Sequence, residues 1–314
     1  MRFTPAANAA DIAPPFDISP HRRLYPFAGH WVQGPGFLYH YLDEGRGEAV
    51  VAVHGNPTWS FYYREVVRAL SSGNRVIVPD HVGCGLSSRP PESVFSYTLA
   101  SHVDNLEALL DYLDLQAGVT LLVHDWGGMI GLACACRRPE RIARIILLNT
   151  GAFLIPAGKK LPWQLSFIHR LPILPDLLVR GFNAFSYLAT FLAVTKRMPP
   201  GVRRAYTAPY NSWQNRLATL RFVQDIPVSP RNGSYALARW TDERLCLLRH
   251  LPMLICWGGR DFVFDDSILA EWRRRFPQAE VHSFPRGGHY ILEDEGDQVI
   301  ELIRTFLDST PRGR

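Results

Sequence analysis

The middle of the sequence holds a short apolar run that leads directly into an aspartate, a tryptophan and two glycines. Residues 119–123 have the composition of a strand buried in a parallel sheet. Gly127, Gly128 and the small residues after them favour a helix that packs closely against that strand. A residue between such a strand and such a helix lies on a sharp turn, with its side chain directed into a cleft. Asp125 occupies this position, from which a carboxylate can attack carbon and form a covalent ester. The alternative is an ordinary helix N-cap.

Apolar strands and helical patterns alternate along most of the chain. Besides the central strand, the pattern predicts two strands between residues 24 and 42, and further strands at 49–53, 75–78, 145–148, 253–257 and 279–284. This alternation predicts an α/β fold with a mostly parallel sheet and helices on both faces. Ligands in such folds bind outside the carboxyl ends of the strands, so polar residues in the following loops are the candidates for a site.

The alternation stops in one internal segment, which predicts a division of the chain. Residues 152–231 are rich in leucine, aromatic residues, proline and arginine, and we predict a helical cap there. The core then consists of residues 24–151 and 232–314, and the Ala/Pro-rich residues 1–23 form a flexible N-terminal arm. Several aromatic side chains of the cap are expected to line an apolar pocket that excludes water: Phe182, Phe185, Tyr187, Phe191, Trp213 and Phe222.

Three candidate catalytic residues each follow a predicted strand. Asp125 is the nucleophile, Asp261 the acid and His289 the histidine, in the chain order nucleophile, acid, histidine. Two glycines before His289 let its loop approach the nucleophile, and Asp261 would hold the imidazole in the right tautomer. Taken singly, Asp261 is equally well explained as a turn residue, and His289 is better explained as an ordinary loop histidine. Their joint placement favours a catalytic triad.

Three further polar residues are candidates for supporting roles. Asn149 stands at a second position where this fold can carry the acid, but an amide cannot supply a negative charge, so we expect it to contribute hydrogen bonds only. Trp126 offers a backbone N–H and an indole N–H, and Asn56 offers a side-chain amide. Neutral donors on two sides would stabilise an oxyanion or a leaving anion. The alternatives are core packing for Trp126 and a turn role for Asn56.

Composition excludes several classes of function. The formal charge is +5 and the pI about 9.0, but the basic residues occur in ones to threes, so no nucleic-acid partner is expected. Five cysteines without C-x-x-C spacing favour a reducing cytoplasm over a disulfide framework or a zinc site. The N-terminus lacks the apolar core of a signal peptide, and the longest nearly apolar stretch, 182–194, is too short for a transmembrane segment. We expect neither a metal nor an organic cofactor.

Four motifs carry a resemblance to a known family, over nearly the whole chain from residue 24: HGNPTWS, VHDWGG, WGGRD and GGHY. With them the chain resembles the haloalkane dehalogenases, a family of the α/β-hydrolase fold. The resemblance implies that Asp125 displaces halide, that Asn56 and Trp126 hold it, and that His289 activates the water that hydrolyses the ester. Epoxide hydrolases share the aspartate nucleophile but usually carry paired cap tyrosines, for which Tyr206 and Tyr210 are candidates.

Longer motifs, several of them in the cap, narrow this resemblance: HGNPTWSFYYR, PDHVGCGLS, HRLPILP, APYNSW, RFVQDIP and HYILED. They make the chain similar to the β-lactone decarboxylases of bacterial long-chain olefin biosynthesis. This implies a hydrophobic long-chain β-lactone substrate, a cis olefin and carbon dioxide as products, and a multienzyme assembly with the pathway's β-lactone synthetase and reductase. A hydrolytic haloalkane dehalogenase is the main alternative, and an epoxide hydrolase a lesser one. A non-catalytic scaffold, whose cap binds a partner, is a hypothesis of another class.

Overall fold

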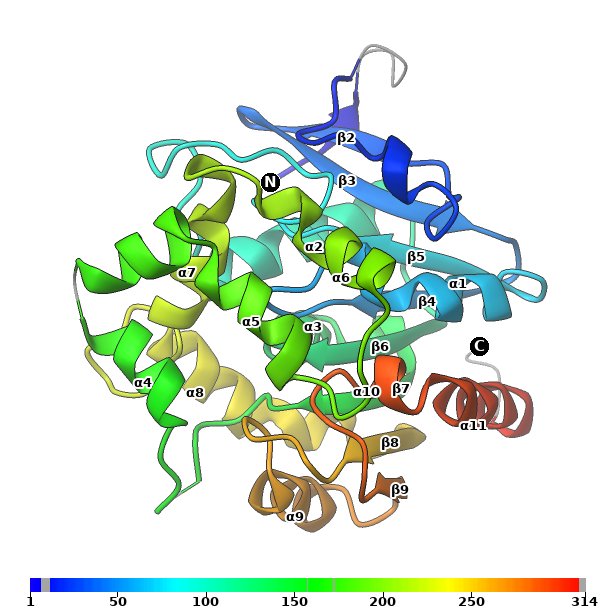
Figure 1. The fold of residues 1–314 in the computed structure, drawn as a ribbon. Helices are drawn as coiled ribbons and strands as arrows, with labels where there is room; N and C mark the ends of the chain where they lie inside the picture. The colour runs from blue at the N-terminus through cyan, green and yellow to red at the C-terminus, as the bar shows by residue number, and fades with distance from the viewer. Residues whose placement is uncertain (7–11, 157, 172, 311–314) are drawn as a thin grey trace.

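The computed structural model describes residues 1–6, 12–156, 158–171 and 173–310 of the chain. Within this part, a nine-stranded sheet crosses the molecule in the order β1-β2-β3-β5-β4-β6-β7-β8-β9 (Figure 1). The strands are β1 Thr4–Pro5, β2 His30–Gly34, β3 Phe37–Glu44, β4 Glu48–Val53, β5 Asn74–Pro79, β6 Val119–Asp125, β7 Ile142–Thr150, β8 Met253–Gly258 and β9 Glu280–Phe284.

The sheet is parallel from β5 to β9 and antiparallel at its N-terminal edge. β4 pairs in parallel with both β5 and β6, and β7, β8 and β9 continue in the same direction. β3 pairs antiparallel with β2 and with β5. The prediction of a mostly parallel sheet is therefore confirmed, and the carboxyl ends of β4, β6, β7 and β8 meet along one edge.

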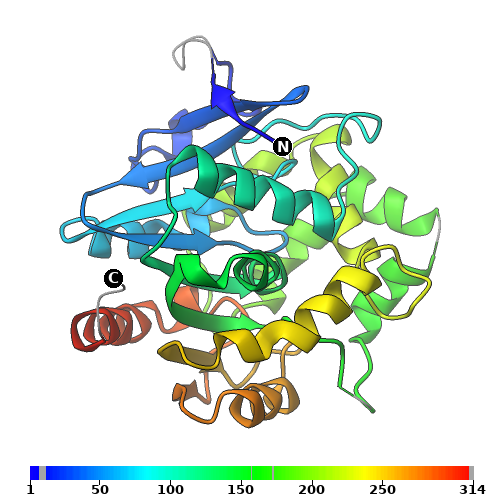
Figure 2. The same ribbon diagram turned by 180° about the vertical axis from the view of Figure 1, so that it is seen from behind.

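Helices cover both faces of the sheet, because each central strand is apolar on both sides. In β4, Val51 and Val53 belong to one buried cluster, and Val50 and Ala52 belong to the other. The first cluster lies under α2, α3, α8 and α9, and the second under α1 and α11 (Figures 1 and 2). These core helices are α1 Arg64–Leu70, α2 Leu99–Tyr112, α3 Trp126–Arg137, α8 Tyr235–Arg244, α9 Asp266–Arg275, α10 Ile291–Asp294 and α11 Gly296–Ser309.

The segment between β7 and α8 contains helical pieces and, in its described residues, no strand. They are α4 Trp163–Arg170, the π-helical turn η5 Asp176–Gly181, α5 Ala184–Leu192, α6 Pro200–Thr207 and α7 Leu217–Gln224. They lie together on the side of the molecule that faces the viewer in Figure 1. Two side chains tie α6 to the core: Trp59 donates to the carbonyl of Ala205 at 3.1 Å, and Tyr206 donates to Glu293 at 2.5 Å. No helix in the described ranges has both the length and the apolar character needed to span a bilayer.

The N-terminal residues add to the core where they are described. Thr4–Pro5 pairs with β2, and Phe3 stacks on Tyr39 with ring centroids 5.4 Å apart. Phe16 is buried and meets Trp59 edge-on at 5.7 Å. Aromatic side chains thus anchor this stretch in spite of its Ala/Pro-rich composition. Residues 7–11 of the predicted flexible arm lie outside the described residues.

Candidate active site

The end of β6 forms the sharp turn that the sequence predicted. Asp125 has φ 52° and ψ −125°, a conformation that non-glycine residues rarely adopt. Its side chain makes no N-cap hydrogen bond, although the backbone N–H of the adjacent Trp126 also faces its carboxylate, so the N-cap alternative is wrong. A Cβ atom at Gly127 would collide with the carbonyl of Val53, and one at Gly128 with the side chain of Thr150. The glycines therefore let α3 start close enough to the sheet to hold the turn.

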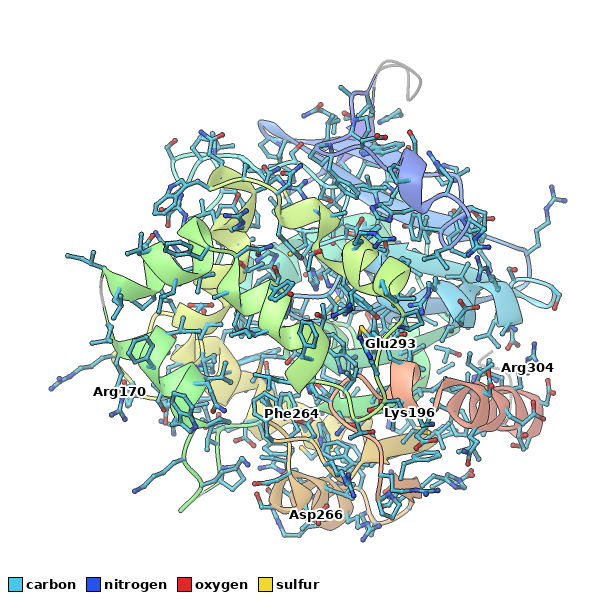
Figure 3. All side chains as sticks on the ribbon, viewed as in Figure 1. Arg170, Lys196, Phe264, Asp266, Glu293 and Arg304 are labelled. Carbon is cyan, nitrogen blue, oxygen red and sulfur yellow. The ribbon has the colours of Figure 1, made fainter. Side chains whose placement is uncertain are left out.

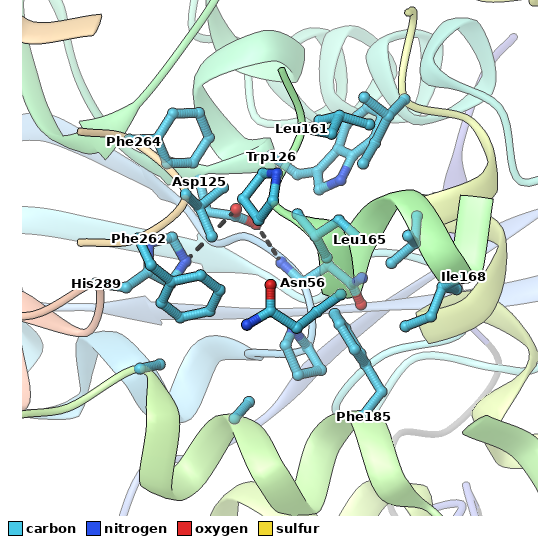
Figure 4. A pocket seen from close by; sticks show the side chains of 18 of the residues that line it. Asn56, Asp125, Trp126, Leu161, Leu165, Ile168, Phe185, Phe262, Phe264 and His289 are labelled. Atoms are coloured by element: carbon cyan, nitrogen blue, oxygen red, sulfur yellow. Dashed lines mark hydrogen bonds and ion pairs between the residues drawn. The ribbon is translucent and has the colours of Figure 1, made fainter. Parts of the chain in front are cut away.

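The Asp125 carboxylate lies between the loop after β4 and the loop after β9. Its Oδ1 accepts a hydrogen bond of 2.7 Å from the backbone N–H of Asn56, and its Oδ2 lies 3.5 Å from Nε2 of His289 (Figure 4). Burial raises the pKa of Asp125, and this outweighs the lowering by His289 and by the backbone N–H of Asn56. One oxygen is thus anchored, while the other faces the imidazole.

The three predicted triad residues meet at the carboxyl edge of the sheet. Nδ1 of His289 lies 2.7 Å from Oδ2 of Asp261, whose Oδ1 accepts hydrogen bonds from the backbone N–H groups of Val263 and Phe264. Burial lowers the pKa of His289, but the carboxylates of Asp261 and Asp125 together raise it above its usual value. The buried imidazole is therefore suited to carry a proton between two anions.

Asn149 lies beside Asp261, and its side-chain hydrogen bonds in the described structure go to Asp261 and Gly258 rather than to Asp125. Its Nδ2 donates to Oδ2 of Asp261 and to the carbonyl of Gly258, both at 3.0 Å, and its Oδ1 accepts from the Gly258 N–H at 2.7 Å. These bonds fix the orientation of the amide. Asn149 is thus placed to hold Asp261, as a hydrogen-bonding residue at the end of β7.

Asn56 and Trp126 both line the space in front of Asp125. The side-chain amide of Asn56 donates to the carbonyl of Thr219 at 3.0 Å, which orients Nδ2 and leaves its second N–H available. The indole of Trp126 packs on Phe222 with ring centroids 5.3 Å apart. The contact of Asn56 with the nucleophile is made by its backbone, a role that sequence reasoning missed because it depends on how the loop is folded.

His124, directly before the nucleophile, is a further residue that the sequence reasoning missed. Its Nε2 lies 2.9 Å from the carbonyl oxygen of His289, which can only accept, so Nε2 carries the hydrogen. The ring stacks on Tyr62 at 4.4 Å. Burial, followed by the charge of His289, lowers the pKa of His124 well below its usual value. A neutral histidine therefore supports the loop that carries His289.

An apolar cavity of about 500 Å³ opens in front of Asp125. Side chains from α4, α5 and the loop after β8 surround it, with Leu161, Leu165, Ile168, Phe185 and Phe262 among those drawn in Figure 4. Of the six cap aromatics expected here, only Phe185 lines the cavity. Phe222 is buried beside Trp126, and the other four project outward: Phe182, Tyr187, Phe191 and Trp213.

The two cap tyrosines that would mark an epoxide hydrolase lie away from this cavity. Tyr206 donates to Glu293, and Tyr210 donates to the backbone carbonyl of Thr58 at 3.2 Å. Both are buried, and neither is among the residues described as lining the cavity. The site therefore lacks the paired phenols that would polarise an epoxide oxygen.

Comparison with known proteins places this geometry in a family. Residues 48–296 match the family described as the alpha/beta hydrolase fold. The chain belongs to the α/β-hydrolase fold family. It is 52% identical over 289 residues to the cis-3-alkyl-4-alkyloxetan-2-one decarboxylase of Shewanella oneidensis, covering 91% of this chain and 90% of that one. The protein of the same name from Xanthomonas campestris is 45% identical, over 88% of this chain and 94% of that one.

More distant relatives are haloalkane dehalogenases. Haloalkane dehalogenase 2 of Mycobacterium bovis is 32% identical, covering 91% of this chain and 97% of that one. Among solved structures, the haloalkane dehalogenase DatA of Agrobacterium tumefaciens superposes with a TM-score of 0.80 at 24% identity, over 90% of this chain and 96% of that one. At that identity the superposition supports the fold. The sequence-based resemblance to the haloalkane dehalogenases and to the β-lactone decarboxylases is confirmed.

Proposed function

We propose that this protein is an enzyme that decarboxylates cis-3,4-dialkyl β-lactones to cis olefins and carbon dioxide, through covalent catalysis by Asp125. The observation that carries the proposal is the 52% identity, over 91% of the chain, to a protein named cis-3-alkyl-4-alkyloxetan-2-one decarboxylase. The site geometry suits both this reaction and hydrolytic dehalogenation, because each needs a buried carboxylate at the base of an apolar cavity. The 32% identity to a dehalogenase makes dehalogenation the second candidate.

The proposed route balances without water or an external base. A carboxylate oxygen of Asp125 attacks the ring carbon that bears the lactone oxygen, with inversion, and the carbon–oxygen bond of the ring breaks to release a carboxylate. The bond between that carboxylate and its carbon then breaks, and its electron pair forms the double bond as carbon dioxide leaves. Asp125 departs from the neighbouring carbon at the same time. Inversion followed by anti elimination keeps the two alkyl chains cis.

The supporting residues fit the charges of this route. The backbone N–H of Asn56 holds Oδ1 of Asp125, which leaves Oδ2 as the attacking atom. The released carboxylate needs donors, and Asn56 and Trp126, which both line the cavity, carry a side-chain amide N–H and an indole N–H that could serve. His289, held by Asp261, supplies positive charge beside the anions. In dehalogenation the same imidazole would have to be neutral in order to activate water.

The initial attack has a competing target, the lactone carbonyl, which would give a mixed anhydride with Asp125. The two intermediates have the same mass but differ in reactivity. Rapid quenching followed by hydroxylamine would convert the anhydride into a hydroxamate and leave an alkyl ester intact. Mass spectrometry of the peptide that contains Asp125 then separates the two routes.

The cellular setting is proposed on independent grounds. We infer that the chain works in the cytoplasm, since all five cysteines are unpaired and four of them are buried. We also infer an assembly with the pathway's β-lactone synthetase and reductase, because a water-insoluble lactone must pass from one enzyme to the next. The division into an arm of residues 1–23, a core, and a cap of residues 152–231 belongs to the same proposal: the cap would cover the lactone during reaction.

A product assay in water enriched in heavy oxygen tests the function directly. The protein and its Asp125→Ala variant each receive a cis-dialkyl β-lactone or a bromoalkane, with enzyme-free controls for thermal loss of carbon dioxide. Olefin formed only with the unaltered protein supports the decarboxylase. Alcohol that carries the heavy oxygen, with bromide released and no olefin, would establish a dehalogenase instead. Equal olefin yields from both proteins would remove Asp125 from the mechanism.

A further inference from the structure

The outer surface of the cap is unusually apolar. Of the sixteen large apolar side chains that are exposed in the described part of the chain, twelve lie within residues 152–231. The most exposed of them are Ile173 at 79%, Trp163 at 76% and Phe182 at 72%. Surfaces with many large exposed apolar side chains commonly mark interaction sites. We call this surface, formed by exposed side chains of α4, η5, α5 and the loops beside them, the outer cap face.

Helix α5 has the reverse burial pattern of an ordinary surface helix, which buries its apolar side and exposes its polar side. Two stripes of apolar side chains run along the helix, one formed by Tyr187 and Phe191 and the other by Leu188 and Leu192. The two residues in each stripe are four positions apart, and all four side chains are exposed. The polar Ser186 and Thr190 lie on the buried side at 3% and 2% exposure. The Thr190 hydroxyl is satisfied locally, because it donates to the carbonyl of Tyr187 at 2.8 Å. This helix therefore presents its apolar side outward.

The same segment carries a strong positive charge. Residues 152–231 contain eleven lysines and arginines but only two acidic residues, a formal charge of +9, whereas the whole chain carries +5. The remainder of the protein thus carries −4. Exposed Lys160, Arg170, Arg197 and Arg204 have no ion-pair partner among the described residues. Arg170 at the end of α4 and Lys196 beyond α5 lie on opposite sides of the cap in Figure 3.

The outer cap face is continuous with the proposed active-site cavity. Trp163, Leu188 and Leu192 are exposed and also line the cavity. Phe262, from the loop after β8, is 39% exposed and lines it too. The apolar lining of the cavity in front of Asp125 thus continues onto the outer cap face. This favours an occupant that itself carries apolar molecules over a protein partner that would only cover the surface.

We propose that the outer cap face docks on the surface of an anionic lipid bilayer. Exposed Trp, Phe and Leu side chains enter the boundary between headgroups and acyl chains, and the surrounding lysines and arginines pair with lipid phosphates. The acidic remainder of the protein then faces away from the membrane. The docking itself does not depend on the catalytic assignment. Its consequence, that a long-chain olefin leaves the cavity directly into the bilayer, rests on the proposed function.

Vesicle binding tests the proposal with the full chain. Vesicles of phosphatidylcholine alone, and with a third of phosphatidylglycerol, are sedimented with the protein at low and high salt. We expect binding to the anionic vesicles, weakened by salt as the charges are screened. Replacing Arg170 and Arg197 by glutamate should weaken partitioning by more than about tenfold, since each basic residue near such a surface adds about fivefold. Ile173→Ser with Phe182→Ser should weaken binding to a similar extent; neither residue is described as lining the cavity.

Matched controls separate docking from net charge and from unfolding. Arg46→Glu with Arg273→Glu makes the same charge change on the core, and Leu247→Ser removes an exposed apolar side chain there. Both should bind vesicles as the unaltered protein does, and all variants should keep its melting temperature. Absent binding, equal binding to both vesicle types, or cap variants that bind normally would overturn the proposal. If the protein instead formed a dimer at high concentration, and the dimer did not bind vesicles, the outer cap face would be assigned to a second copy of the chain.

The catalytic proposal is tested separately in the same preparations. Asp125→Ala should bind vesicles normally even though it makes no olefin, so loss of activity and loss of docking are independent results. Lactone supplied in vesicles should be converted more slowly by the Ile173/Phe182 variant than by the unaltered protein, whereas lactone in detergent should be converted equally. Vesicle binding without any olefin formation would leave docking intact and refute the proposed function.

Discussion

Asn149 donates a hydrogen bond of 3.0 Å to Oδ2 of Asp261, across the carboxyl ends of the adjacent parallel strands β7 and β8. The same oxygen lies 2.7 Å from Nδ1 of His289. Because Asn149 also binds both backbone groups of Gly258, its amide cannot rotate away from the acid. The carboxylate that orients the histidine is thus itself oriented from the neighbouring strand.

This relationship predicts that the acid can be moved from one strand to the next. Asp261→Asn removes the charge that stabilises protonated His289, and activity should fall about 10²-fold. Adding Asn149→Asp should recover about tenfold of that loss, since the new carboxylate would lie within hydrogen-bonding distance of residue 261. Steady-state rates of the two single variants and the double variant check this. Asn149→Asp alone puts two carboxylates together and should lower both activity and melting temperature. A double variant no better than Asp261→Asn would show that position 149 cannot replace the acid.

The protonation state of His289 predicts opposite pH dependence for the two candidate reactions. Its pKa is raised above the usual value by Asp261 and Asp125, against the effect of burial. Dehalogenation needs the neutral imidazole and should accelerate as the pH rises through that raised pKa. Decarboxylation needs no proton removed by His289, so its rate should stay level or fall over the same range. Steady-state rates measured from pH 6 to 9, with lactone and with bromoalkane as substrate, compare the two pH dependences. A lactone rate that rises with the ionisation of His289 would assign the imidazole a base role in decarboxylation.

The sheet and the spatial meeting of Asp125, Asp261 and His289 were predictable because their signals are local in the sequence. An apolar run shows a buried strand by itself, and parallel topology brings the residues after such strands to one edge. Asp125, Asp261 and His289 each follow a strand, so their meeting required no knowledge of side-chain contacts. The donors that hold them were harder to predict. The backbone of Asn56 and the ring of His124 act through a loop conformation and a contact between distant residues, which leave no pattern in the sequence.

The outward direction of the cap aromatics was not predictable for a different reason. Burial is assigned from sequence by placing apolar side chains inward, and α5 reverses that rule with Ser186 and Thr190 inside. Only the arrangement of the surrounding helices determines which side of α5 is covered. The composition of residues 1–23 was similarly uninformative, because three separate side chains, Phe3, Phe16 and Ile18, are the buried ones in the described parts of that stretch.

A buried histidine outside the triad predicts acid-sensitive stability. Burial, then the charge of His54, lowers the pKa of His102 to about 3, whereas an unfolded chain gives the ordinary 6.5. Below pH 6.5 the unfolded state therefore binds more protons, and the free energy of unfolding falls by about 1.4 kcal/mol per pH unit from this residue. Between pH 6.5 and 5, the free energy of unfolding, measured with urea, should therefore fall by about 2 kcal/mol less in His102→Phe than in the unaltered protein. Neither ring nitrogen has a partner among the described residues, and the ring already stacks on Phe222. Exposed His250→Phe is the control and should change nothing.

His124 predicts a structural effect on the catalytic loop that can be separated from catalysis itself. His124→Phe keeps the stacking on Tyr62 but leaves the buried carbonyl of His289 without its donor, at a cost of about 1–3 kcal/mol in unfolding free energy. The loop would then hold the imidazole less firmly at its 3.5 Å distance from Asp125, so the turnover number should fall more than the affinity for substrate. His124→Gln retains a donor and should recover stability and rate together. If both variants lost activity equally while His124→Phe melted at the normal temperature, the hydrogen bond to the His289 carbonyl would not be the cause, and His124 would act on Asp125 in another way.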